Sequence, residues 1–139
     1  MPLAEVRERP PRTVGPDRSD AALCTLAAWG AIGQAAVHVP VIEHHFVEAA
    51  YVGVGLVAFV VAGIHLAVRL LTGPDNLVWA ATGLLGAAGI VCYLLSRTVG
   101  LPHLHHDIGN WADPLGTVAI TCEAVMVSAA TAHARRRRR

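Results

Sequence analysis

The sequence predicts an all-α membrane protein with four transmembrane helices in an antiparallel up-down bundle and both termini in the cytoplasm. Three observations support this fold class. The chain of 139 residues is 54% hydrophobic and only 15% charged, well to the apolar side of soluble domains. It contains four apolar stretches of ~20 residues or more, the length that crosses a ~30 Å hydrocarbon core. If the four stretches cross the membrane in turn, ten of the eleven arginines fall on the same side of the membrane. The chain has no lysine.

Three regions follow along the chain. Residues 1–19 are rich in Pro, Arg and acidic residues without apolar periodicity, so we expect a disordered basic tail. Residues 20–134 form the predicted transmembrane domain, and 135–139 are a poly-Arg tail. The apolar stretches run from Asp20 to about Val39, Glu48 to Leu71, Asn76 to Leu95 and Pro114 to Ala134. The first also has features of a secretory signal with a cleavage site near Ala35, but we expect it to be retained as a helix.

The segment from Gly73 to Asn76 combines a helix stop with a helix start. Asp75 or Asn76 is a candidate N-cap, because a short polar side chain can accept a hydrogen bond from the first turn. We therefore expect the second and third helices to form an antiparallel hairpin. Small residues in these two helices suit close contacts with neighbouring helices: Gly53, Gly55, Gly63, Gly83, Gly86 and Gly89. Cysteines 24, 92 and 122 lie in apolar stretches without C-x-x-C spacing and are expected to be buried small residues.

The arginines predict the orientation of the helices. With cytoplasmic termini, the inner side holds ten of the eleven arginines and the outer side holds Arg97 alone, as the positive-inside rule requires. The connections 38–47 and 96–113 then face the outside. Trp111 is expected at the outer interface and Trp79 near the inner one, as aromatic anchors.

Six of the eight histidines fall in these two outer connections, and four acidic residues lie in the connections or at the adjoining helix end. Imidazole and carboxylate groups at one membrane face suit a divalent transition metal such as zinc or copper. The candidate ligands are His38, His44, His45, Glu48, His103, His105, His106 and Asp107. In a helix, His44 and Glu48 share a face. Two other interpretations stay open: a solvated polar rim, or a pH response of clustered imidazoles with pKa values near ~6.5.

Glu123 and His65 lie within predicted helices, where a charged side chain costs at least ~2.5 kcal/mol. Their depths differ by ~12 Å at 1.5 Å per residue, so we expect no direct bond between them. His65 is expected to pair locally as a neutral imidazole, with Arg69 reaching the cytoplasmic interface. Glu123 is a candidate proton relay. Alternatively, it is neutralised by a hydrogen bond to Tyr93, Ser96 or Thr98, or by an ion pair with Arg97.

Around Arg97 the chain resembles a group of small multi-helix membrane proteins of high-GC actinobacteria for which no activity is established. The residues that carry the resemblance are the run SRTVGLP from Ser96 to Pro102, then Trp111, Pro114-Leu115-Gly116 and Glu123. The group typically has this run at the end of one helix and an acidic residue inside the next. The resemblance covers about the last third of the chain and supplies no reaction. The His-Leu-His-His insert departs from the group's pattern.

These features favour a membrane binding or accessory protein with an outer histidine and carboxylate cluster. Two alternatives are a structural or assembly subunit of a larger membrane complex, and a transporter or oxidoreductase component that uses Glu123 for proton transfer. No catalytic residue is assigned, because no catalytic triad, phosphate loop or carboxylate pair is present. Haem is less favoured than a metal ion, since the histidines do not recur in pairs at matched depths. The expected partners are the lipid bilayer and further membrane subunits or copies of the chain, not nucleic acid.

Overall fold

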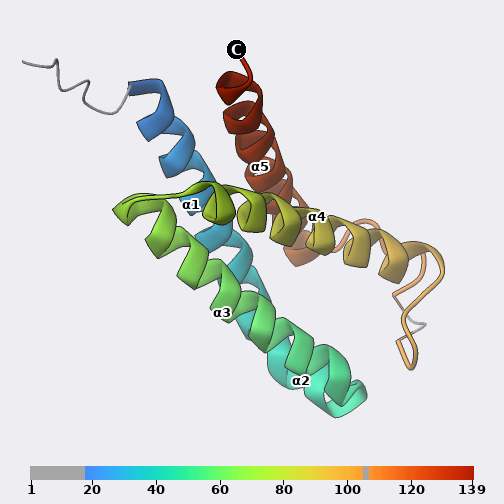
Figure 1. Ribbon diagram of the computed structural model, residues 1–139. Coiled ribbons are helices and arrows are strands. Elements are labelled where there is room, and N and C mark those ends of the chain that lie inside the picture. The colour runs from blue at the N-terminus through green and yellow to red at the C-terminus, as the bar shows by residue number, and fades with distance from the viewer. Residues whose placement is uncertain (1–17, 105–106) are drawn as a thin grey trace, which may run out of the picture.

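The computed structural model describes residues 18–104 and 107–139, which form helices and no strand (Figure 1). The elements are α1 (Arg18–His38), the 3-10 turn η1 (Val39–Val41), α2 (Ile42–Glu48), α3 (Ala50–Thr72), α4 (Asn76–Thr98) and α5 (Pro114–Arg137). Four helical segments are long and apolar enough to cross a membrane: Asp20–Glu48, α3, α4 and α5. The prediction of an all-helical chain with four candidate spans is confirmed, and it indicates a multi-pass membrane protein. Apart from the first residues of α1, the predicted N-terminal tail lies outside the described residues.

Two aspartates set where the later helices begin. Gly73 ends α3 with a φ of 143°, a conformation that glycine adopts without steric penalty. Asp75 then caps α4, as predicted, because its Oδ1 accepts the Val78 N–H at 2.8 Å. Asp113 caps α5 in the same way, accepting the Gly116 N–H at 3.1 Å. Both caps place a carboxylate at a helix start, where the helix dipole favours it.

The connection between the first two spans is helical, whereas the sequence predicted a loop from 38 to 47. The short 3-10 turn η1 connects α1 directly to α2. The extended backbone of Ala49 (φ −153°, ψ 94°) then separates α2 from α3. α2 packs against the beginning of α3, where the ring of Phe46 covers Gly53 so closely that a Cβ at Gly53 would overlap it. The contact between the Phe46 ring and the bare surface of Gly53 therefore favours a helix, α2, at this position over an open loop.

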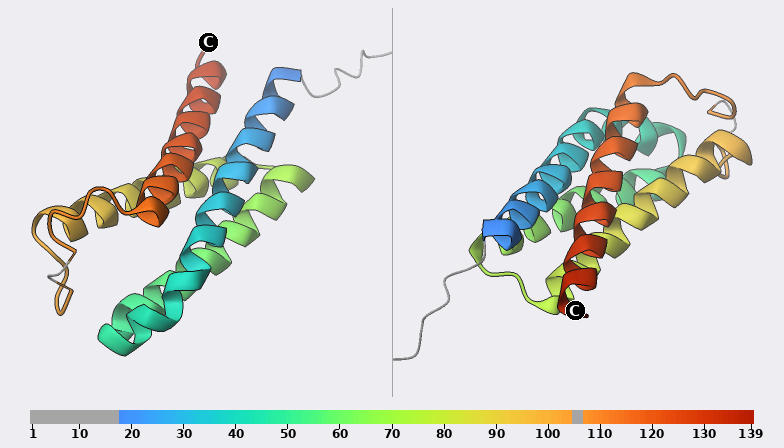
Figure 2. Two further views of the ribbon diagram at one scale, coloured as in Figure 1. Left: turned by 180° about the vertical axis from the view of Figure 1, so that it is seen from behind. Right: turned by 90° about the horizontal axis from the view of Figure 1, so that it is seen from above.

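The helices pack tightly at one end and spread at the other. α1 lies between α3 and α5, and α4 packs mainly on α5 (Figures 1 and 2). The buried core is built largely from small residues of α1 and α5 with larger ones from α3 and α4: Ala27, Ala28, Ala31, Leu66, Ala67, Leu70, Val78, Trp79, Met126 and Ala129. We call the end with the start of α1, the turn 73–75 and the end of α5 the terminal end. The opposite end, with residues 38–49 and 99–113, is the loop end.

α3 and α4 diverge from the turn that joins them (Figure 1), rather than packing along their length as the expected hairpin. At the terminal end, Arg136 pairs with Asp20 at 3.7 Å, and Arg137 donates a hydrogen bond to Asn76. α5 thus stays helical through most of the predicted poly-Arg tail. Trp79 is buried between helices at the terminal end, where it stacks on His133 with ring centroids 4.4 Å apart.

Candidate functional site

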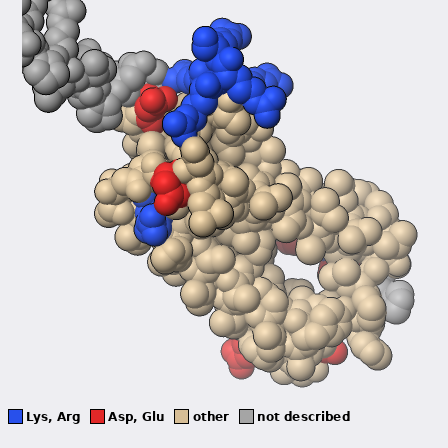
Figure 3. All heavy atoms as spheres, in the orientation of Figure 1, with Lys and Arg blue, Asp and Glu red and all other residues tan. Residues whose placement is uncertain are grey.

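The spreading helices enclose a cavity of ≈ 410 Å³ at the loop end. Figure 3 shows this hollow as an opening between the arm formed by α2 and α3 and the arm formed by α4. All the long helices and α2 contribute to its wall. The apolar side chains of the wall include Val37, Val41, Leu56, Phe59, Leu101 and Leu104, and its polar side chains include His38, His45, Tyr51, Tyr93, Arg97 and Glu123. We call this space the loop-end cavity.

Glu123 is the most deeply placed carboxylate of the cavity. Its residue is only 1% exposed, and its Oε2 has no hydrogen-bond partner among the described residues. Across from it, α4 carries Gly89, and a Cβ at that position would overlap the Glu123 carboxylate. At 1.5 Å per residue, Glu123 lies ~13 Å along α5 from its start. A glycine on one helix therefore makes room for a buried acid on the next.

The neutralising hydrogen bonds expected for Glu123 are not formed. Thr98 and Ser96 donate to backbone carbonyls of their own helix, at 2.7 and 2.8 Å. The Tyr93 hydroxyl donates at 3.4 Å to the carbonyl of Trp111. Each of the three expected partners is thus directed elsewhere, and Glu123 faces the cavity without them.

The alternative ion pair between Arg97 and Glu123 is not formed either. Arg97 is only 7% exposed and bonds to two aspartates, with its Nη1 2.6 Å from Asp107 Oδ1 and its Nη2 3.0 Å from Asp113 Oδ2. Its guanidinium also lies 5.1 Å from the centre of the Tyr93 ring, a cation–π distance. This network joins the end of α4 to the start of α5 and holds Asp107 and Asp113 at the wall of the cavity.

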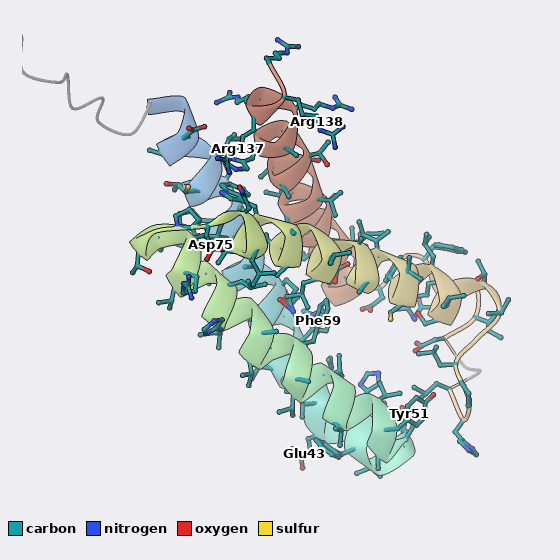
Figure 4. All side chains as sticks on the ribbon, viewed as in Figure 1. Glu43, Tyr51, Phe59, Asp75, Arg137 and Arg138 are labelled. Carbon is teal, nitrogen blue, oxygen red and sulfur yellow. The ribbon has the colours of Figure 1, made fainter. Side chains whose placement is uncertain are left out.

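A hydrogen bond joins the two arms at the loop end. The Tyr51 hydroxyl, at the start of α3, donates to the Pro102 carbonyl at 2.8 Å. Figure 4 shows Tyr51 at the loop end beside the connection that follows α4, and Phe59 two turns further along α3. The cavity therefore has a rim closed by Tyr51 and an inner wall that includes Phe59.

The predicted metal ligands are only partly brought together. His44 Nε2 lies 3.2 Å from Glu48 Oε1, so the predicted shared face is confirmed, and the His44 and His45 rings are 5.7 Å apart. His38 and His45 each place Nδ1 within hydrogen-bond distance of a backbone carbonyl one turn earlier, at 2.7 and 2.8 Å. Each of these two imidazoles thus has one ring nitrogen engaged by its own helix.

The second set of predicted ligands is dispersed or outside the described residues. His103 is exposed, with a φ of 68°, and Asp107 is engaged by Arg97. His105 and His106 lie outside the described residues. Within 18–104 and 107–139, no group of three His, Cys, Asp or Glu residues is arranged to hold a metal ion. The metal site stays a prediction.

His65 differs from expectation, and the burial of a second polar residue, Gln34, was not predicted. His65 is exposed on the outer face of α3 among valines and alanines, instead of being paired locally, and Arg69 bonds to Asp75 at 3.4 Å. Gln34 of α1, which the sequence analysis passed over, is fully buried; its Nε2 donates to the Phe59 carbonyl at 3.4 Å. An amide in the middle of an otherwise apolar stretch was the available signal for it.

Comparison with known proteins adds no relative. No family model matches the chain, and neither a curated protein nor a solved structure matches it significantly. The resemblance to the actinobacterial group stays a prediction. What the protein does is therefore inferred from the loop-end cavity and the side chains around it.

Proposed function

We propose that the protein is a membrane binding or transport component in which Glu123 takes up and releases a proton at the bottom of a cavity reached from outside the cell. The proposal includes an antiparallel up-down arrangement of the four spans with both termini in the cytoplasm. The observation that carries it is the burial of Glu123 with an unpartnered carboxylate oxygen beside the loop-end cavity.

Charge supports the orientation. The terminal end carries the arginines of α5, which Figure 3 shows gathered at one extremity of the molecule. The described part of the loop end has a single arginine, Arg97, and its charge is balanced by Asp107 and Asp113. By the positive-inside rule, the terminal end is then cytoplasmic and the cavity faces the other compartment.

The surroundings of Glu123 support the role of proton carrier. An ionised carboxylate is expensive in an apolar interior unless a cation or several hydrogen bonds compensate it. Arg97 lines the same cavity, but its guanidinium is already shared by Asp107 and Asp113. Glu123 is therefore best accommodated either as the neutral acid or as a carboxylate with a cation bound beside it. Exchange between these two states is the chemistry of a proton-coupled binding site.

Dicyclohexylcarbodiimide tests the protonated state, because it reacts with neutral carboxyl groups in apolar surroundings. We expect peptide mass spectrometry of treated membranes to find the adduct on Glu123. Asp113 serves as an internal control: it is ion-paired and should stay unmodified. The E123Q variant should lose the adduct. Absence of modification at Glu123 over the whole pH range in which the protein stays folded would refute the proposal.

The orientation has its own test. In a variant with cysteines 24, 92 and 122 replaced by alanine, single cysteines are introduced at Glu43, at Asn110 and at Arg139. A membrane-impermeant maleimide should modify the first two in intact cells and the third only after permeabilisation. Modification of Glu43 and Asn110 from opposite sides would exclude a common outer face.

A second candidate function is divalent metal binding at the histidines, favoured by the His44–Glu48 pair at 3.2 Å with His45 beside it. Elemental analysis of the purified chain tests it, with a variant in which His44, His45, His103, His105 and His106 are replaced by alanine. A stoichiometric metal that disappears in the variant would support this function. An intact chain without bound metal would exclude it.

A further inference from the structure

We infer that the loop-end cavity binds a hydrophobic organic cation, an amine or substituted ammonium ion with an apolar body, and that Glu123 is its counter-charge. This inference rests on the proposed role of Glu123, and it names the class of ligand that would share the site with the proton. It follows from three properties of the cavity: its charge, its lining and its openings.

The charge of the cavity favours a cation. Three carboxylates line it, Glu123, Asp107 and Asp113, against one arginine. Because the two terminal nitrogens of Arg97 bond to these aspartates, an anionic ligand would have to compete with two carboxylates for the guanidinium. Glu123 keeps an oxygen without a hydrogen-bond partner among the described residues, and an ammonium N–H is a donor that this oxygen can accept. The carboxylate and the ammonium group then neutralise one another within the membrane.

The lining favours an organic cation over a metal ion. Divalent metals need several oxygen, nitrogen or sulfur ligands at once, and no group of three such residues surrounds Glu123 within 18–104 and 107–139. Most of the wall near it is apolar, including Leu56 and Phe59 from α3 and Ala119 from α5. A volume of ≈ 410 Å³ is within the ~300–1,000 Å³ range of small-molecule sites. A ligand with one charge and an apolar body matches such a wall.

The openings favour an amphiphilic ligand. α3 and α4 diverge towards the loop end (Figures 1 and 3), so in a bilayer the cavity opens between two spans as well as at the membrane face. A hydrophobic amine partitions into the interfacial region of a bilayer, with its charge near the headgroups and its apolar part below them. It can therefore approach the cavity from the lipid. A strongly hydrated solute would have access only at the face that the connection 99–113 and Tyr51 partly close.

Three probes of nearly equal shape and different charge test the inference: 2-phenylethylamine, 2-phenylethanol and 3-phenylpropionate. Each is titrated by equilibrium dialysis against the full chain in nanodiscs of zwitterionic lipid, with empty nanodiscs subtracted. We expect saturable binding of the amine at one site per chain, and binding of the alcohol and of the acid at least about tenfold weaker. Equal binding of the amine and the alcohol would overturn the inference, because it would mean that the cavity only receives apolar matter.

Variants of the chain separate the contribution of the Glu123 charge to binding from that of the apolar wall. E123Q should weaken the amine at least about tenfold and leave the alcohol unchanged. E43Q, which removes an exposed carboxylate that does not line the cavity, is the matched control and should bind like the original chain. Gly55 lines the cavity, and a Cβ there meets nothing within 4 Å, so Gly55→Leu should fill space and weaken the amine and the alcohol alike. Amine binding that survives E123Q in a folded protein would overturn the inference.

The carbodiimide experiment distinguishes the two proposals. Modification of Glu123 without amine binding would leave the proton site standing and reject the ligand class. Amine that protects Glu123 from the carbodiimide, while the alcohol does not, would support both. If Glu123 does not react with the carbodiimide but amine binding still depends on Glu123, the cation site stands and the proposed role as proton carrier is rejected.

Discussion

Asp113 and Asp75 perform the same local task but pair with arginines of very different burial. Each caps a transmembrane helix, with carboxylate-to-amide distances of 3.1 and 2.8 Å. Asp113 also bonds at 3.0 Å to Arg97, which is 7% exposed. Asp75 bonds at 3.4 Å to Arg69, and both of those side chains are about half exposed, at 60% and 43%. The two positions thus form a matched pair for measuring what burial adds.

Replacement by alanine should therefore be more costly at position 113. D75A loses a cap worth ~1 kcal/mol and an exposed ion pair worth ~0–1 kcal/mol. D113A loses a similar cap and a hydrogen bond to a buried charge worth ~1.5–3 kcal/mol, or about 2.5–4 kcal/mol in all. Because Asp107 still holds Arg97, the cost should stay below that of stripping the arginine of both partners. We expect D113A to be less stable than D75A by ~2 kcal/mol.

Unfolding by SDS titration of purified protein in mixed micelles measures the free energy of unfolding of both variants. The asparagine variants D113N and D75N separate cap from charge, because asparagine also caps helices well. D75N should be nearly neutral, whereas D113N should retain most of the loss of D113A. Equal destabilisation by D113A and D75A would refute the view that the Arg97 network stabilises the loop end.

Four further variants test the packing and the rim of the cavity. Gly86→Ala should destabilise by ~1–3 kcal/mol in the same titration, since its Cβ would lie 2.7 Å from a backbone carbonyl of α5, whereas Gly55→Ala should be tolerated because nothing lies within 4 Å. His133→Phe should be at least as stable as the original chain, because stacking on Trp79 is kept and two buried ring nitrogens without partners are removed; a large loss of stability would indicate an unseen polar partner. Tyr51→Phe should change stability by ~1 kcal/mol or less but speed chymotrypsin cleavage of the connection 99–113 several-fold; unchanged cleavage would show that its hydroxyl does not hold the rim.

The spans and helix starts could be predicted because they depend on local properties. Continuous apolar stretches give the transmembrane segments, and an aspartate after Gly73-Pro74 gives the cap of α4. The close approaches at glycines were also legible: Gly63 and Gly86 contact α1 and α5, where a larger residue would collide. These signals need only a few neighbouring residues to be interpreted.

The partners of the polar side chains could not be predicted, because they depend on how the helices diverge. The sequence suggests Glu123 as a possible partner of Arg97. In the structure Arg97 bonds to Asp107 and Asp113 instead, and Glu123 is left to the cavity. The sequence predicts Trp79 near a membrane interface, but it does not predict that His133 from α5 stacks on it. Hydropathy gives depth in the membrane but not the neighbour on the next helix, and that neighbour decides the role of each group.

The small residues of α1 and α5 have a mechanical consequence. α1 presents Ala27, Ala28 and Ala31 to this seam, and α5 contributes Ala129 and the flexible side chain of Met126, so a small pivot there meets little steric resistance. Because this seam lies far from the Tyr51–Pro102 contact, a slight rotation at the pivot is amplified by the length of the helices. A small change of angle at this seam would therefore widen or narrow the loop-end cavity, and the hydrogen bond from Tyr51 to the Pro102 carbonyl opposes that change.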